Sequence, residues 1–308
     1  MVIRTEGLTK RFGSVLAVDN LSLEVARGHV FGLLGDNGSG KTTTLGMLLG
    51  LIRPTSGSIC LFGQDVSTST HHGALRRIGA IVETPAFYPY LSGRQNLRYF
   101  ASISHRGDAN EVERLLKLVG LSARADNKFS TYSLGMKQRL GVAQALIGDP
   151  ELVLLDEPTN GLDPAGMAEM RNLIRELHSD GRTILLCSHL LHTVEQVCQG
   201  VAILSRGRLI AQGSIAELRA QHSAIQVKTT DDTKAKKVIA SLPCVASVTK
   251  QQNYLIVTAP QDRSSELCAM LAEQGVFVCE MSPVRFSLEQ YFLEVTREDT
   301  ALDHGASQ

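Results

Sequence analysis

Short apolar runs alternate with helical patterns along the chain as far as about residue 219. Three of these runs are short enough to be buried strands: Val30 to Gly35, Leu152 to Asp156 and Thr183 to Ser188. Strands that alternate with helices are typical of a parallel sheet covered by helices. The pattern therefore predicts an α/β fold for this part of the chain.

The stretch from about residue 84 to residue 147 has a different pattern. Residues Glu111 to Val119 are amphipathic at helical spacing, a second helix is predicted to begin at Ser133, and no strand run lies between them. We interpret residues 84–147 as a helical subdomain inserted into the α/β core.

The pattern changes again near His222. Beyond it the predicted order is strand, helix, two strands, helix and strand, over Ile225 to Thr229, Thr233 to Leu242, Val245 to Thr249, Tyr254 to Thr258, Ser264 to Gln274 and Val276 to Glu280. This order is typical of a small ferredoxin-like α+β module. We therefore expect a large domain over residues 1–221, an accessory domain over residues 222–299 that ends in a helix at Ser287 to Thr296, and a disordered tail over residues 300–308.

Composition narrows the range of partners. The 31 basic and 31 acidic residues cancel, so the chain lacks the global positive field that draws proteins to nucleic acids. Its six cysteines form no C-x-x-C pair, and we expect reduced thiols as in a cytosolic protein. The N-terminus has no signal-peptide core and no apolar run is long enough to span a membrane, so the chain itself is not expected to cross a bilayer.

The first candidate for chemistry follows the strand at Val30. It fits the pattern G-x-x-x-x-G-K-[ST] and consists of Gly35, Asp36, Asn37, Gly38, Ser39, Gly40, Lys41 and Thr42, with Thr43 next. Between a strand and a helix, such a loop turns its backbone N–H groups onto phosphate oxygens, and the helix dipole adds positive partial charge. Lys41 would bridge the β- and γ-phosphates, and the Thr42 hydroxyl would bind Mg²⁺. A glycine-rich turn with a chance lysine would not explain the flanking strand and helix.

Two carboxylates end the apolar strand that begins at Leu152. Asp156 and Glu157 would lie at the carboxyl end of a parallel strand, the edge where α/β sheets bind ligands. One carboxylate there can hold Mg²⁺ or its waters, and the other can polarise an attacking water. An acidic pair after a strand also occurs in ordinary turns, but the phosphate loop upstream favours the catalytic interpretation.

These segments, in this order, resemble the ATP-binding subunits of ABC transporters from about residue 3 to residue 219. The resemblance implies a P-loop NTPase core of the ABC ATPase type, with Asp156 at the Mg²⁺ site and Glu157 as the catalytic base. It also places Phe12, in the segment TKRFG, where the family has an aromatic residue that stacks on adenine. Without the resemblance, ordinary core packing would explain Phe12.

The segment YSLGMKQR, which begins at Tyr132, resembles the signature helix of the same family. Ser133 stands as an N-cap and Gly135 lies in the first turn, so the helix end offers free N–H groups to an anion. The resemblance implies that this end holds the γ-phosphate bound by the P-loop of a second ATPase subunit, and hence a dimer, expected to be a homodimer. Leu134 and Met136 depart from the glycine and glutamine usual at their positions.

Three further positions align with functional positions of the family; two carry the family's residue and one departs from it. Asp163, in the segment NGLDP, resembles the D-loop aspartate that contacts the second subunit, although helix capping alone would also explain it. His189 matches the switch histidine that touches the γ-phosphate. Glu83 stands where most members have the Q-loop glutamine; its oxygens suit a hard cation, but it adds negative charge beside the triphosphate. With the segments YSLGM and GRQNL, Glu83 resembles the bacitracin-resistance and lantibiotic-immunity branch, whose members pair with ABC-2-type membrane subunits.

The resemblance implies an ATPase that uses ATP and Mg²⁺ to drive export of a peptide, antibiotic or lipid-like substrate through a separate ABC-2-type permease, from the cytoplasmic face of the cell membrane. The main alternative is a soluble ABC-family ATPase acting on ribosomes or DNA, which the single P-loop and the lack of sustained heptads disfavour. A small-molecule kinase would explain the phosphate loop but not the signature segment. The C-terminal module carries no catalytic constellation, and packing or dimerisation is its expected role.

Overall fold

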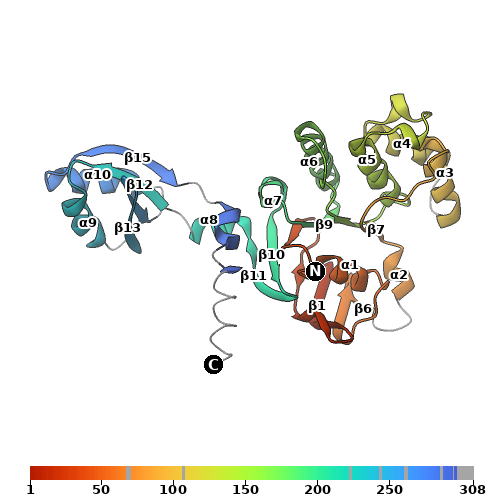
Figure 1. Cartoon of the computed structure of the whole chain (residues 1–308), viewed down its shortest axis with the longest axis horizontal. Helices are drawn as coiled ribbons and strands as arrows, with labels where there is room; N and C mark the ends of the chain where they lie inside the picture. The colour runs from red at the N-terminus through yellow and green to blue at the C-terminus, as the bar shows by residue number, and fades with distance from the viewer. Residues whose placement is uncertain are drawn as a thin grey trace. The chain divides into compact units, whose positions relative to one another are not determined.

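The computed structural model describes residues 1–66, 71–105, 108–221, 224–242, 245–259, 263–284, 287–293 and 295–296. The chain divides into two compact units (Figure 1): residues 1–213 with the C-terminal residues from Phe292, and residues 214–291. The expected tail over residues 300–308 and the expected boundary at His222 lie outside the described residues.

A six-stranded sheet forms the centre of the first unit, in the order β11-β10-β4-β9-β8-β7. From β10 to β7 the neighbouring strands are parallel. The strands β4, β8 and β9 are buried along their whole length, because parallel strands are covered on both faces. All three predicted strands are confirmed. The bounds are β4 Val30–Leu34, β7 Ile78–Ile81, β8 Leu152–Asp156, β9 Thr183–Ser188, β10 Gly200–Ser205 and β11 Arg208–Ser214.

A second sheet of the same unit is antiparallel. Its order is β2-β1-β5-β6, and β3 pairs with β1. Ile3, Leu21 and Leu61 of this sheet are fully buried in one core with Leu45 of α1 and Leu33 of β4. The sheet therefore supports α1 from outside the parallel sheet. The bounds are β1 Ile3–Phe12, β2 Val15–Leu21, β3 Glu24–Val25, β5 Ser56–Leu61, β6 Gln64–Asp65 and α1 Lys41–Leu48.

The predicted helical subdomain is visible in Figure 1 as a group of helices that carries no strand among its described residues. In α4, Val112, Leu115 and Leu116 are buried, as expected from the amphipathic pattern. The helix α5 begins directly after Ser133, as predicted. The bounds are α3 Gly93–Ser104, α4 Ala109–Leu118 and α5 Leu134–Ala145, with short 3-10 turns at Ser122–Arg124 and Phe129–Thr131.

The other helices of the first unit flank the parallel sheet. The helix α6 begins at Pro164 after the N-cap Asp163, and it buries Met170, Ile174 and Leu177. Figure 1 shows α6 and α7 near β9, which both helices contact. The bounds are α2 His71–Leu75, α6 Pro164–Ser179 and α7 Leu191–Val197.

The second unit contains a four-stranded antiparallel sheet in the order β13-β14-β12-β15. Its elements follow one another as strand, helix, strand, strand, helix and strand. Ile225 and Val257 of the sheet share a core with Ile239 of α9 and Leu271 of α10. The bounds are α8 Ile215–Gln221, β12 Ala224–Thr229, α9 Asp232–Ala240, β13 Ser247–Gln251, β14 Tyr254–Thr258, α10 Ser264–Glu273 and β15 Val278–Val284. Residues 288–293 and 295–296 are helical.

Candidate active site

The loop between β4 and α1 is the predicted phosphate-binding loop, and its path depends on glycine. Gly35 and Gly40 have φ values of 156° and 101°. A methyl group on Gly35 would lie 2.3 Å from Ser39 Oγ, and one on Gly40 would lie 2.6 Å from the Ala17 carbonyl oxygen. No larger residue fits at either position without displacing the loop. Asp36, Asn37 and Gly38 lie exposed at the tip, whereas Thr43 is half-buried on α1.

Lys41 is held at the base of this loop and only 5% of its surface is exposed. Its Nζ donates to the carbonyl oxygens of Gly35 at 2.7 Å and of Asp36 at 3.1 Å. The same nitrogen lies 3.6 Å from Oε1 of Glu157. The lysine therefore joins the phosphate loop to the end of β8.

Asp156, the last residue of β8, is 4% exposed. Its Oδ2 accepts a hydrogen bond of 2.7 Å from the Thr42 hydroxyl, and its Oδ1 has no hydrogen-bond partner among the described residues. Burial raises the pKa of Asp156; the Thr42 hydrogen bond and Lys41 oppose this rise, and the charges of Glu157 and Glu83 add to it. A buried carboxylate with one unpaired oxygen beside two other acids is a fitting ligand for a hard cation.

Glu157 follows β8 in a left-handed conformation, with a φ of 47°. Its N–H donates to the Cys187 carbonyl oxygen at 3.0 Å. Its Oε2 lies 2.9 Å from Nδ1 of His189 and accepts the His189 N–H at 3.4 Å. Since non-glycine residues seldom adopt this backbone region, the surrounding contacts must hold Glu157 there. We call Lys41, Thr42, Asp156 and Glu157 the Walker edge.

Glu83 and Phe12 are the next two predicted site residues. Glu83 is exposed just beyond β7 with a φ of 60°, and its charge acts on the pKa of Asp156. Phe12 ends β1 and is 48% exposed, so it is not a core residue. Lys10 Nζ lies 4.7 Å from the centroid of its ring. An exposed aromatic ring of this kind can stack on a flat ligand.

The other predicted site residues lie at two helix starts. Ser133 Oγ accepts the Met136 N–H at 3.3 Å at the start of α5. Asp163 Oδ1 accepts the Gly166 N–H at 3.0 Å at the start of α6, which is a capping contact. Gly135 lies half-buried in the first turn of α5. Within the described part of the chain, no hydrogen bond or ion pair joins Ser133, Gly135 or Asp163 to the Walker edge.

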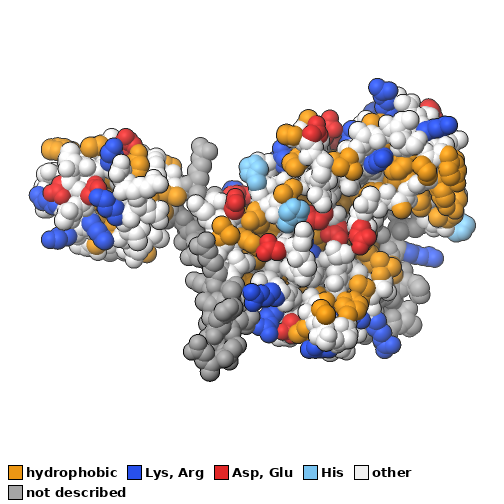
Figure 2. Space-filling view, in the orientation of Figure 1, with side chains coloured by type: hydrophobic (Ala, Val, Ile, Leu, Met, Phe, Trp, Pro, Cys, Tyr) orange, Lys and Arg blue, Asp and Glu red, His pale blue; other side chains and the backbone are white. Residues whose placement is uncertain are grey.

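The loop that leads from Glu83 to α3 contains a functional feature that the sequence pattern did not predict. Asn96 of α3 is fully buried; its Oδ1 accepts the Tyr88 N–H at 2.9 Å, and its Nδ2 donates to the carbonyl oxygens of Tyr88 at 3.1 Å and Ser92 at 3.0 Å. These bonds fix a loop that leaves Tyr90 66% exposed. The Tyr88 ring lies near both Tyr90 and Tyr99, and Tyr99 is 41% exposed. Figure 2 shows the hydrophobic side chains gathered over this part of the helical subdomain. The sequence signal for this feature is the segment GRQNL, which contains Asn96 and matches the family.

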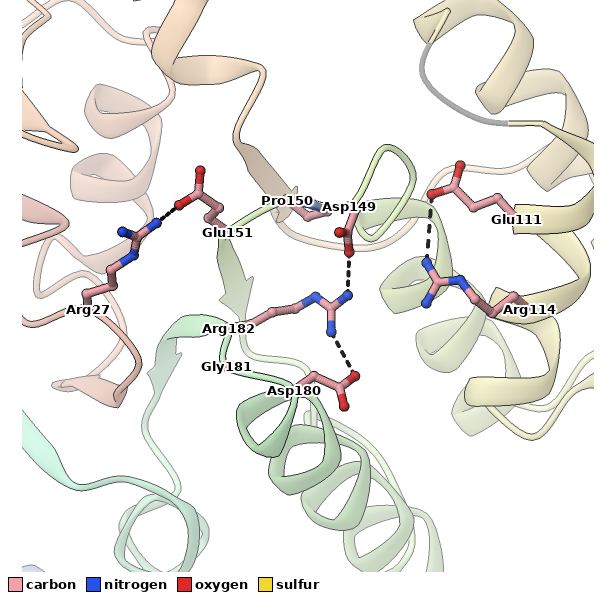
Figure 3. Close-up of a pocket in the computed structure, with 9 residues that line it drawn as sticks. All are labelled: Arg27, Glu111, Arg114, Asp149, Pro150, Glu151, Asp180, Gly181 and Arg182. Atoms are coloured by element: carbon pink, nitrogen blue, oxygen red, sulfur yellow. Dashed lines mark hydrogen bonds and ion pairs between the residues drawn. The ribbon is translucent and has the colours of Figure 1, made fainter.

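A polar pocket of about 710 Å³ lies at the opposite edge of the sheet, before β8 and β9 (Figure 3). Arg182 donates to Asp149 at 2.6 Å and to Asp180 at 2.9 Å, and Arg27 pairs with Glu151. Acidic and basic side chains thus neutralise one another across the pocket. None of the predicted site residues lines it.

Comparison with known proteins adds independent evidence. A family model described as ABC transporter matches residues 18–160. The chain is 39% identical to the bacitracin transport ATP-binding protein BcrA of Bacillus licheniformis over 297 residues, which cover 96% of this chain and 97% of that protein. The chain belongs to the ATP-binding subunits of ABC transporters. The resemblance of this ABC ATPase to the bacitracin-resistance proteins is thereby confirmed.

Two further similarities bear on the fold of the ABC ATPase. It is 35% identical over 313 residues to the daunorubicin resistance ATP-binding protein DrrA3 of Streptomyces coeruleorubidus, with 99% of this chain and 98% of that protein covered. A solved ATP-binding subunit of an ABC transporter is 30% identical, with a TM-score of 0.63, and covers 72% of this chain and 93% of its own. The predicted P-loop NTPase core is confirmed. The alternative of an ATPase acting on ribosomes or DNA finds no support in these similarities.

Proposed function

We propose that this ABC ATPase binds MgATP at the Walker edge, hydrolyses it as one half of a nucleotide-sandwiched dimer, and drives an ABC-2-type exporter through a separate membrane subunit. One observation carries the proposal. The Glu157 carboxylate lies 3.6 Å from Lys41 Nζ and 2.9 Å from His189 Nδ1, at the carboxyl edge of a parallel sheet. A general base for ATP hydrolysis is expected at this position, between Lys41, which would bind the γ-phosphate, and His189, which would contact it.

In this proposal, Glu157 accepts a proton from the water that attacks the γ-phosphorus. The new P–O bond forms as the bond to the bridging oxygen of ADP breaks, and that oxygen leaves with ADP. Lys41 has three N–H donors, and the carbonyl oxygens of Gly35 and Asp36 take two of them. The third can serve a phosphate oxygen, while the loop N–H groups from Asn37 to Thr43 cradle the rest of the triphosphate and Phe12 stacks on adenine.

The donor set of the Walker edge fits a magnesium ion. The Thr42 hydroxyl and the Asp156 carboxylate are hard oxygen ligands in direct contact, and Asp156 Oδ1 is unpaired among the described residues. Glu83 is the third proposed oxygen donor. No cluster of three His, Cys, Asp or Glu side chains able to hold a metal occurs among the residues that the structure describes, so phosphate oxygens and water would complete the coordination. When bound, the ion would neutralise charge on the phosphates.

The proposed dimer would bring together two groups of residues that do not contact each other within one chain. Ser133 and Gly135 present the N-terminal end of the 12-residue helix α5, which favours an anion, but they do not contact the Walker edge of their own chain. In a two-fold dimer each α5 start faces the γ-phosphate held by the other chain, and Asp163 lies at the same interface. A homodimer satisfies both sites with a single chain type.

A membrane subunit is the proposed second partner. None of the helices that the structure describes is long and apolar enough to span a membrane. The relatives named for bacitracin transport and daunorubicin resistance support an exporter of antibiotic-like or peptide substrates. The exposed ring of Tyr90, on the loop fixed by Asn96, offers the permease an apolar contact at the cytoplasmic face of the membrane.

The first test compares Glu157→Gln with wild type in steady-state ATPase activity and in MgATP-dependent dimerisation. General bases contribute about 10²- to 10⁴-fold, so turnover should fall by at least about 10²-fold while an ATP-stabilised dimer accumulates. Glu176→Gln makes the same chemical change on an exposed position of α6 and should behave as wild type. A Glu157→Gln chain that hydrolyses ATP at the wild-type rate would show that the base is another residue.

The second test addresses coupling. Liposomes that contain the membrane subunit with wild type or with Glu157→Gln are loaded with ATP, and movement of bacitracin, a lantibiotic or an anthracycline is followed. We expect ATP-dependent movement with wild type only. The absence of any ATP-dependent movement with wild type would count against the exporter assignment while leaving the ATPase assignment intact.

A further inference from the structure

Leu134 is the first residue of α5 and stands where glycine is usual in the signature segment. Its side chain is 43% exposed. One of its methyl carbons, Cδ2, nevertheless lies against the loop that precedes α6, because a methyl group built on Gly161 would lie 3.0 Å from it. A glycine at position 134 could not make this contact.

The loop that Leu134 touches leads directly back to Glu157. The Asn160 N–H donates to the Glu157 carbonyl oxygen at 3.0 Å, and the Leu162 N–H donates to the Thr159 carbonyl oxygen at 3.3 Å. The two turns overlap, and Gly161, an inner residue of the second turn, has a φ of 73°. Two overlapping hydrogen-bonded turns make a short, stiff connection, so a displacement of Gly161 is transmitted to the backbone of Glu157.

A second contact joins the same two segments. Leu162 is 7% exposed, and a methyl group on Gly135 would lie 3.9 Å from its Cδ2. Leu162 is therefore a buried anchor that holds the loop near α5. Leu134 adds a contact on the exposed side, where an arriving ligand or subunit can move it.

We propose that Leu134 is a positioning residue that couples phosphate binding at the start of α5 to the backbone of Glu157 in the same chain. The inference rests on the sandwich dimer proposed above. In that dimer the start of α5 serves the nucleotide of the second subunit, whereas Glu157 serves the nucleotide of its own. Leu134 would thus make hydrolysis at each site depend on occupancy of the other.

The test removes the contact and measures cooperativity. Leu134→Ala is compared with Leu51→Ala, which removes the same atoms from a leucine that is 72% exposed. With two coupled sites, the Hill coefficient for ATP hydrolysis should approach about 2 in wild type and in Leu51→Ala. In Leu134→Ala it should fall towards 1, whereas the melting temperature and the ATP affinity of the dilute, monomeric chain should not change. A purely structural role would instead lower the melting temperature.

A double-mutant cycle tests whether the contact with Gly161 carries the coupling. Gly161→Ala adds backbone strain at positive φ and also pushes on Leu134 Cδ2. In the Leu134→Ala background only the strain remains, so Gly161→Ala should lower the rate of ATP turnover by a smaller factor there than in wild type. Equal effects in both backgrounds would overturn the proposed contact.

The outcomes separate this inference from the proposed function. A cooperative wild type with an equally cooperative Leu134→Ala variant overturns the role of Leu134 and leaves the sandwich dimer intact. A wild type that shows neither cooperativity nor an ATP-dependent dimer overturns the sandwich and this inference together.

Discussion

The Walker edge and the start of α5 differ in how much of their chemistry one chain contains. At the Walker edge, Lys41, Thr42, Asp156 and Glu157 already contact one another, and Lys41 and Asp156 are nearly fully buried. At the start of α5, Ser133 and Leu134 are exposed, and Ser133 contacts only its own helix among the described partners. In the proposed dimer, the groups that act within one chain are thus held in place before binding, whereas the groups that would act across the interface remain exposed in the single chain.

The largest effect on ATP binding and turnover is expected from a substitution in the Walker edge. Lys41→Ala removes the cation that would bind the phosphates and the ion pair with Glu157. Loss of one preorganised charged donor lowers kcat/KM by about 10²- to 10³-fold, and we expect weaker ATP binding even by the monomer. Calorimetric titration with ATP and steady-state kinetics measure both quantities. Lys117→Ala, an exposed lysine on α4, is the control, and tight ATP binding by Lys41→Ala would contradict the assignment.

The next effect concerns the start of α5. Ser133→Ala should reduce turnover by about tenfold, the value of one hydrogen bond to a charged group, while ATP binding by the monomer stays at the wild-type level. Ser133→Thr keeps both the hydroxyl and the N-cap and should restore turnover. If Ser133→Ala instead weakened ATP binding by the monomer, the start of α5 would act on the nucleotide of its own chain, which would contradict the proposed dimer.

A smaller effect concerns stability rather than turnover. The pKa of Asp156 is raised in the folded chain, chiefly by burial, so the folded state binds more protons than the unfolded state between the ordinary and the raised pKa. Stability from this group is therefore present at low pH and lost as pH rises through the raised pKa. Asp156→Asn should raise the melting temperature at neutral pH without nucleotide, because a neutral amide avoids the cost of burying a charged carboxylate. Scanning calorimetry at pH 7 checks this, and a lower melting temperature would contradict it.

The smallest effect on turnover is expected at Asp163, where two substitutions distinguish helix capping from dimer contact. Asp163→Ala removes the acceptor for the Gly166 N–H and should destabilise the chain by about 1 kcal/mol. Asp163→Asn keeps the cap and should leave the melting temperature unchanged, with turnover reduced less than tenfold. Thermal melts and ATPase assays of both variants decide the matter: a large loss of turnover in Asp163→Asn would show that dimer contact dominates.

Sequence patterns predicted the parts of the fold that have one dominant signal. The strands at Leu152–Asp156 and Thr183–Ser188 are continuous apolar runs, and both were predicted with their correct bounds. The helix α5 was placed by its N-cap Ser133. The antiparallel sheet that begins at Ile3–Phe12 was not predicted, because its strands are irregular in burial and carry register shifts that blur alternation.

The candidate site was predicted residue by residue but not in its geometry. Motif spacing identifies Lys41 and Glu157 but cannot show that they lie 3.6 Å apart, because that distance depends on how β4 and β8 flank β9. The left-handed backbone of Glu157 could not be predicted from its residue type, because glutamate is not among the residues that favour positive φ. In the sequence, Asn96 is only one residue of the segment GRQNL. Its role in fixing the loop before α3 is seen from its complete burial and its hydrogen bonds.

The loop fixed by Asn96, together with the lack of tryptophan in the chain, offers a way to observe this surface by fluorescence. The chain contains six tyrosines and no tryptophan. Tyr88, Tyr90 and Tyr99 lie together, with ring centroids 5.9 Å apart for the first pair and 5.1 Å for Tyr88 and Tyr99. Tyr90→Trp would therefore place a single indole on the outer surface of the helical subdomain. Its emission maximum would shift to the blue when a permease covers that surface, and no other residue of the chain would contribute an indole signal.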